Sequence, residues 1–144
     1  RRLLMRLHLI AVTEQITAQL HLLGQDVYET AAPDDSSLTF DGSGNLLPYI
    51  VVQYADMFPT SDNGITGAKY DGAKSYMLVS CVAQNERATR QVADLVKNNI
   101  VGFQPSDAGE IRFEGGAIAY SAIETKPNRY VTEIGFTFAV NTAW

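Results

Sequence analysis

The side chains able to do chemistry in this sequence are few, and their spacing matches no familiar kind of active site. His8 and His21 are the two imidazoles, and neither belongs to an HExxH-type pair that would bind zinc. Cys81 lies inside an apolar run, where a thiol usually behaves as a small hydrophobic group. Ser80 and Ser121 are not part of a GxSxG sequence. We therefore predict no catalytic residues, no metal site and no cofactor, and a protein that is not an enzyme.

The segment DGSGN at residues 41–45 begins like a calcium-binding loop, with oxygen-bearing side chains at its first, third and fifth positions. The pattern then fails, because Leu46 stands where a glycine is required and Val52 where a bidentate carboxylate is required. The glycines also miss the phosphate-binding patterns GxGxxG and GxxxxGK. We predict that this segment is a turn.

Aspartates are the chemical groups that gather in the predicted loops. Six of them lie outside the predicted helices and strands, namely Asp34, Asp35, Asp41, Asp56, Asp62 and Asp71. These side chains can line a common surface, or they can simply keep the loops soluble. The sequence leaves both interpretations open.

Apolar periodicity predicts the elements that must position these loops. Steps of three and four predict a first helix that ends at Gly24, with its apolar side made by Leu9, Val12, Ile16, Leu20 and Leu23. Asn85 is a favourable N-cap for a second helix, which is predicted to run to about Val101. Strands are predicted at residues 49–54, 74–83, 117–124 and 130–140, and the first of these is expected to be buried on both faces. We predict an α+β fold, with a mostly antiparallel sheet of four to six strands and two helices packed on one face.

The second helix and the last strand are predicted to pack on each other. The apolar stripe of this helix consists of Ala88, Val92, Leu95, Val96 and Ile100. We expect Val92, Leu95 and Val96 to cover the strand face that carries Ile134, Phe136 and Phe138. On the solvated side of the helix, Arg90 and Asp94 are expected to form an ion pair.

Length, charge and composition exclude several classes of protein. With 144 residues, of which 46% are apolar, the chain is expected to form a single domain, with residues 1–8 extraneous to it or flexible. Its net charge of −5 supplies no positive field that would gather DNA. A single cysteine allows no internal disulfide, which favours a reducing environment. No apolar run is long enough to span a membrane.

Two features near the predicted loops and the end of the chain favour contacts with partners. The long loop at residues 56–73 carries the apolar residues Met57 and Phe58, followed by Asp62 and Asn63. Long loops in compact domains are commonly functional, and exposed apolar groups often mark partner sites. Trp144 is a large aromatic residue at the end of the chain, and we expect it to pack against this domain or a neighbour. These five residues are the predicted interface.

The layout of elements resembles the tail terminator, or tail completion, proteins of long-tailed bacteriophages. The resemblance covers most of residues 10–141 and follows three segments: LPYIVVQYAD, SYMLVSCVAQNERATRQVADLVKNNIVGF and AIAYSAIETKPNRYVTEIGFTFAVN. These motifs are architectural, and the family has no catalytic residue to compare. The Arg-rich start before Thr13 departs from the family's pattern.

This resemblance implies a structural virion protein at the head-proximal end of the tail, assembled in the host cytoplasm. It implies a homo-hexameric ring that caps the tail tube protein, ends tube polymerisation and presents the surface that docks the head-tail connector. DNA would pass through the ring without specific binding. If the loop aspartates face that channel, the lumen residues are Asp34, Asp35, Asp41, Asp56 and Asp71, with Asp62 a sixth candidate.

Two other functions remain open from the sequence. The same size and topology suit a neck or head-tail joining subunit of a virion. A different class is a small-ligand-binding or enzymatic α+β domain whose site is assembled from scattered residues. The particle size of the pure protein, or the position of its gene beside tail-tube genes, would separate these functions.

Overall fold

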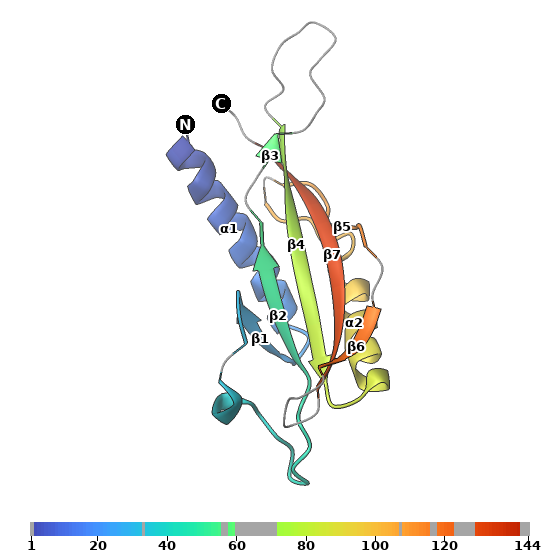
Figure 1. The fold of residues 1–144 in the computed structure, drawn as a ribbon. Coiled ribbons are helices and arrows are strands. Elements are labelled where there is room, and N and C mark those ends of the chain that lie inside the picture. Colours follow the sequence, from blue (N-terminus) through green and yellow to red (C-terminus); the bar gives the residue numbers. More distant parts are fainter. Residues whose placement is uncertain are drawn as a thin grey trace, which may run out of the picture.

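The computed structural model describes residues 2–32, 34–55, 58–59, 72–106, 108–115, 118–122 and 129–141 (Figure 1). The elements in chain order are α1 (Arg2–His21), β1 (Asp26–Glu29), the 3-10 helix η1 (Asp35–Ser37), β2 (Tyr49–Tyr54), β3 (Phe58–Pro59), β4 (Gly72–Ala83), α2 (Glu86–Ile100), β5 (Arg112–Phe113), β6 (Ile118–Ala122) and β7 (Arg129–Asn141). The helices and long strands lie where periodicity predicts them, although α1 begins well before Leu9.

The described strands form one sheet that is five strands wide, in the order β1-β2-β4-β7-β5. β4 is antiparallel to both β2 and β7, and β1 is parallel to β2 at one edge. The short strand β3 pairs with β4, and β6 pairs with β7 at the opposite edge from β1. The predicted α+β class with a mostly antiparallel sheet is therefore confirmed.

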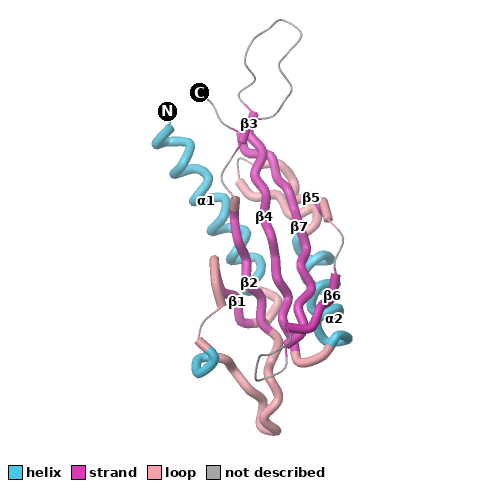
Figure 2. The backbone as a smooth tube through the Cα atoms, in the orientation of Figure 1, coloured by secondary structure: helices cyan, strands magenta, loops and turns pink. Residues whose placement is uncertain are grey.

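Both helices cover the same face of the sheet, as predicted (Figure 2). One buried cluster joins the apolar sides of α1 and α2 to the inward side chains of the three central strands: Val12, Ile16, Leu20, Val92, Ala93, Val96, Ile100, Ile50, Val52, Met77, Val79, Cys81, Ile134, Phe136 and Phe138. Burial of this apolar surface is the main force that holds the two layers together.

The ends of α2 follow local rules, but its sides differ from the prediction in two places. The Asn85 side chain caps the helix by accepting a 2.7 Å hydrogen bond from the Ala88 N–H. Leu95 is 37% exposed, so its assignment to the core stripe was wrong. The inward positions beside Val92 are taken by Ala93 and Thr89.

The predicted ion pair of α2 between Arg90 and Asp94 was also wrong. Arg90 binds Glu86 at 2.6 Å, on the turn before it, and Asp94 binds Lys97 at 3.2 Å. Arg90 has a carboxylate four residues away in each direction, and in this structure Lys97 occupies the one toward the C-terminus. Both pairs are solvent-exposed and contribute little to stability.

Among the described residues, a second cluster covers one end of the opposite face of the sheet. Leu38 and Leu46, from the segment between β1 and β2, form a second buried cluster with Tyr49, Val51 and Val82. Because Ile50 and Val52 point into the main core while Tyr49 and Val51 point into this cluster, β2 is buried on both faces, as predicted.

Candidate functional site

The side chains that the sequence analysis considered for catalysis or metal binding do not come together in the part of the chain that the structure describes. His21 is exposed at the end of α1. Cys81 is fully buried in the main core, and burial raises the pKa of its thiol to about 12. A thiol with that pKa stays protonated at neutral pH, so Cys81 behaves as a small hydrophobic group.

No group of three or more His, Cys, Asp or Glu among the described residues is placed to hold a metal ion. The DGSGN segment is instead a tight turn closed by its own aspartate. Both the Ser43 N–H and the Asn45 N–H donate to Asp41 Oδ1 at 2.9 Å. These hydrogen bonds, the one from Asn45 first, lower the pKa of Asp41. The turn predicted from the sequence is confirmed.

The loop aspartates are attached to two different ends of the sheet. Asp34 and Asp41 are exposed on the segment that precedes Tyr49, the first residue of β2. Asp56 and Asp71 lie outside the described residues, as do Asp62 and the side chain of Asp35. Ala55, which precedes Asp56, and Gly72, which follows Asp71, lie beyond the other end of β2. A surface lined by all six aspartates therefore needs contributions from both ends of the subunit.

The predicted interface residues are attached to a single end of the sheet. Met57, Asp62, Asn63, Trp144 and the side chain of Phe58 lie outside the described residues. The backbone positions that lead to them are neighbours. Phe58 of β3 pairs with Lys74 of β4, and Gly72 of β4 pairs with Asn141 of β7. The long loop and the C-terminal segment thus leave from neighbouring positions, which periodicity alone could not establish.

The open part of the helix-free face carries a polar cluster that sequence reasoning missed. The Thr137 hydroxyl donates a 2.7 Å hydrogen bond to Glu114 Oε1, and Lys74 Nζ lies 3.7 Å from the same oxygen. The Thr137 bond first and the Lys74 charge second lower the pKa of Glu114. These three residues come from β7, β4 and the turn after β5, so their meeting depends on strand register.

Tyr76 on β4 lies across Gly135 on β7 on this same open face. A methyl group built on Gly135 would come within 3.0 Å of the Tyr76 ring carbon Cζ and closer still to its hydroxyl oxygen. The glycine therefore leaves room for the aromatic ring to lie flat on the sheet. Tyr76 remains 37% exposed.

The outer surface of α2 carries an open hollow. Its volume is about 340 Å³, and its described lining is made by Glu86, Arg87, Arg90, Gln91 and Asp94. Mixed charges on a single helix, with no buried polar group among them, form no catalytic arrangement. The described helices include none that is long and apolar enough to cross a membrane.

No protein-family model matches this sequence, and no curated protein matches it. A solved structure does match in three dimensions: a chain of the virion of a native gene transfer agent particle. The TM-score is 0.51 at 20% sequence identity, and the match covers 91% of this chain and 92% of that chain. The likeness shows a shared fold that extends over nearly the full length of both chains.

Proposed function

We propose that this chain is a structural virion protein, a tail terminator that forms a ring on the tail tube. The observation that carries the proposal is the fold shared, along almost the whole chain, with a component of a phage-like virion particle. The resemblance of the sequence to tail terminator proteins supports the same role. In this proposal the protein is not an enzyme and binds no cofactor.

The shape of the subunit suits a protein that lies between two partners. β4 has twelve residues, and a strand of that length is about 40 Å long. The 34–47 segment lies at one end of the sheet, and Phe58, Gly72 and Asn141 lie at the other. We assign contact with the tail tube to the end that carries Met57, Phe58, Asp62, Asn63 and Trp144. The opposite end then faces the head-tail connector.

The loop aspartates fit a channel through which DNA passes without being held. Each cation in such a wall would add affinity for phosphate by releasing counterions, and each carboxylate avoids it. In a hexameric ring, Asp34, Asp35 and Asp41 would form one acidic tier, and Asp56 and Asp71, with Asp62, a second. Two tiers are proposed because Tyr49 and Ala55, the described residues toward which these two groups lead, lie at opposite ends of β2.

The decisive experiment measures tail length in particles whose copy of this protein lacks residues 61–66. The loop deletion should spare folding, because the described core is built without the residues between strands β3 and β4. Tails of increased and variable length are expected, since nothing would then stop tube growth. Replacing residues 61–66 with six glycine and serine residues serves as the matched control, because it keeps the length of the loop and removes its other side chains.

Four outcomes distinguish the candidate roles. Overlong tails support the terminator. Tails of normal length that fail to join heads would identify the neck or head-tail joining role instead. Normal, infectious particles from the 61–66 deletion would remove this loop from the mechanism, and normal particles from a complete gene deletion would remove the virion role.

A further inference from the structure

Charge is divided unequally between two long stretches of the chain, which follow a start that carries Arg1, Arg2 and Arg6. Residues 7–68 contain no Lys or Arg and eight carboxylates: Glu14, Asp26, Glu29, Asp34, Asp35, Asp41, Asp56 and Asp62. Residues 72–141 contain seven carboxylates and seven cations, and the cations are Lys74, Arg87, Arg90, Lys97, Arg112, Lys126 and Arg129. The fold turns this division into two flanks, because α1 and β1 lie at one edge of the sheet and β5 and β6 at the other.

The acidic flank is defined as Glu14, Asp26, Glu29 and Asp34. Arg2 and Arg6 also belong to α1, but their side chains lie outside the described residues. None of these four carboxylates forms an ion pair with a described Lys or Arg; Glu29 and Asp26 accept hydrogen bonds from Thr17 and Thr39 instead. Like charges held together on one surface repel each other in the free subunit. A cationic surface from a partner would relieve that repulsion.

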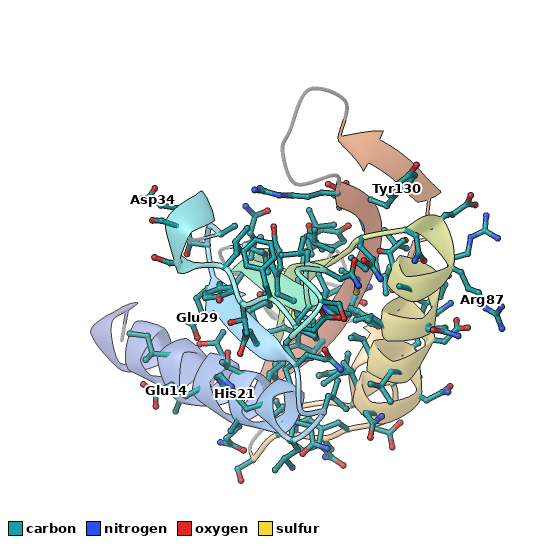
Figure 3. All side chains as sticks on the ribbon, turned by 90° about the horizontal axis from the view of Figure 1, so that it is seen from below. Glu14, His21, Glu29, Asp34, Arg87 and Tyr130 are labelled. Carbon is teal, nitrogen blue, oxygen red and sulfur yellow. The ribbon has the colours of Figure 1, made fainter. Side chains whose placement is uncertain are left out.

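The α2 hollow on the opposite flank presents such a cation. Glu86 and Asp94 are each paired with a cation of the same helix, Arg90 and Lys97. Arg87 is left without a described carboxylate partner. Seen along the sheet, Arg87 points outward on the side of the molecule opposite Asp34 and Glu29 (Figure 3).

The 34–47 segment, which carries Asp34 of the acidic flank, lies at the same end of the sheet as the α2 hollow and differs from it in shape. Tyr49 pairs with Val82, so the 34–47 segment that leads into β2 and the start of α2 that follows β4 are level with each other. The 34–47 segment extends beyond the strands at this end (Figure 1), whereas Arg87 lines a hollow. The segment carries the exposed residue Phe40, at 41%, and α2 carries Leu95, at 37%, one turn beyond Gln91 of the hollow. Apolar anchors ringed by charged groups are typical of protein interfaces.

We propose that the acidic 34–47 segment of one copy docks in the α2 hollow of a second copy, with Asp34 beside Arg87. A second copy is the partner because the chain itself supplies both complementary surfaces, at one level and on opposite sides. Such a head-to-tail contact generates a ring when its rotation closes. Asp34 then lies between neighbouring subunits, and the channel tier at this end of the sheet is left to Asp35 and Asp41. The closed ring rests on the proposed tail function, whereas the pairwise contact can be tested by itself.

The test is self-association of the purified chain at low ionic strength, measured by sedimentation velocity over a range of concentrations. Asp34→Lys and Arg87→Glu should each weaken association by on the order of tenfold or more, because like charges then face each other. The combined variant Asp34→Lys/Arg87→Glu restores opposite charges and should recover association, as should an equal mixture of the two single variants. Added salt should weaken the wild-type contact.

Controls separate the contact from unfolding and from net charge. Glu110→Lys makes the same charge change as Asp34→Lys at an exposed position outside both surfaces, and it should associate like wild type. Circular dichroism and the unfolding midpoint check that every variant is folded. The combined variant has the net charge of the wild type, so its recovery cannot come from net charge.

Several results would overturn the proposal. The wild-type chain could stay monomeric at every concentration, or both single variants could associate like wild type. Association could also be lost in only one of the two single variants, or the combined variant could associate no more tightly than either single variant. The tail experiment is independent: charge-dependent association with unaffected tails leaves the contact standing and rejects the tail role. If the loop deletion alters tail length but neither Asp34→Lys nor Arg87→Glu changes self-association, the contact is rejected and the tail role stands.

Discussion

The two faces of the sheet are built in different ways. The helix-covered face is apolar almost throughout, with Ile134, Phe136 and Phe138 of β7 fully or almost fully buried beneath α2. Outside its small second cluster, the open face carries polar side chains. These contact one another across neighbouring strands, as Glu114 does with Thr137 and Lys74. Most of the stability therefore comes from one face, and the other can vary with little cost to folding.

The largest effect is expected on the covered face. Phe136→Ala should lower the free energy of unfolding by about 3–5 kcal/mol, because it leaves a cavity beneath α2. Phe113→Ala is the matched control, since that ring packs edge-on against Phe136 at 6.0 Å but is 42% exposed. Denaturant unfolding measures both. A loss below about 1 kcal/mol for Phe136→Ala would place the residue outside the core.

A smaller effect is expected from the polar pair inside the covered face. The Thr89 hydroxyl donates to the Cys81 carbonyl and lies 3.2 Å from the Thr132 hydroxyl, all of it buried. Thr89→Val should cost about 1–3 kcal/mol, because Thr132 loses its described side-chain partner. Adding Thr132→Val should recover much of this loss. A double variant as unstable as the sum of the two singles would show that the hydroxyls are not coupled.

On the open face, Gly135→Ala should cost about 1 kcal/mol, because the new methyl group displaces the Tyr76 ring from the strand. In a Tyr76→Ala background the same change should become stabilising by about 0.5 kcal/mol, since alanine suits a strand better than glycine. Thermal or denaturant unfolding of the four proteins gives the comparison. The same sign in both backgrounds would mean that Tyr76 does not occupy this position.

The smallest effect concerns the titration of Glu114. Its pKa is lowered in the folded protein, by Thr137 first and Lys74 second, so its contribution to stability is present above the ordinary value of 4.5. The contribution is lost as the pH falls through the lowered folded value. Thr137→Val should move the NMR titration midpoint of Glu114 upward, and Glu114→Gln should flatten the acid side of the stability profile. An unmoved midpoint would show that Thr137 does not set this pKa.

Local sequence rules predicted the features whose causes are local. Asn85 caps α2 through a hydrogen bond within one turn, and Gly24 follows α1 with a φ of +79° that suits glycine. Asp41 closes its turn through bonds to residues two and four positions away. Alternation along the last strand likewise predicted which side chains face the helices, since side-chain direction has a period of two in any strand.

Leu95 shows where such rules stop. Its spacing from Val92 and Ile100 fits the buried stripe, but the roll of α2 on the sheet gives the inward positions to Thr89 and Ala93. That roll is decided by how both helices share the sheet face, a quantity that no window of sequence contains. Arg90 shows the same limit. It has an acidic residue four positions away in each direction, and the sequence analysis predicted a pair with Asp94, whereas the structure has a pair with Glu86.

By itself the sequence determined the α+β class, the main helices and strands, the turn at Asp41 and the unequal division of charge. Only the tertiary structure decided which distant groups meet: Tyr76 with Gly135, Glu114 with Thr137, and Gly72 with Asn141. The physical reason is register. Hydrogen bonding between strands far apart in the chain fixes these neighbours, and shifting the pairing by one residue would turn every one of them to the other face.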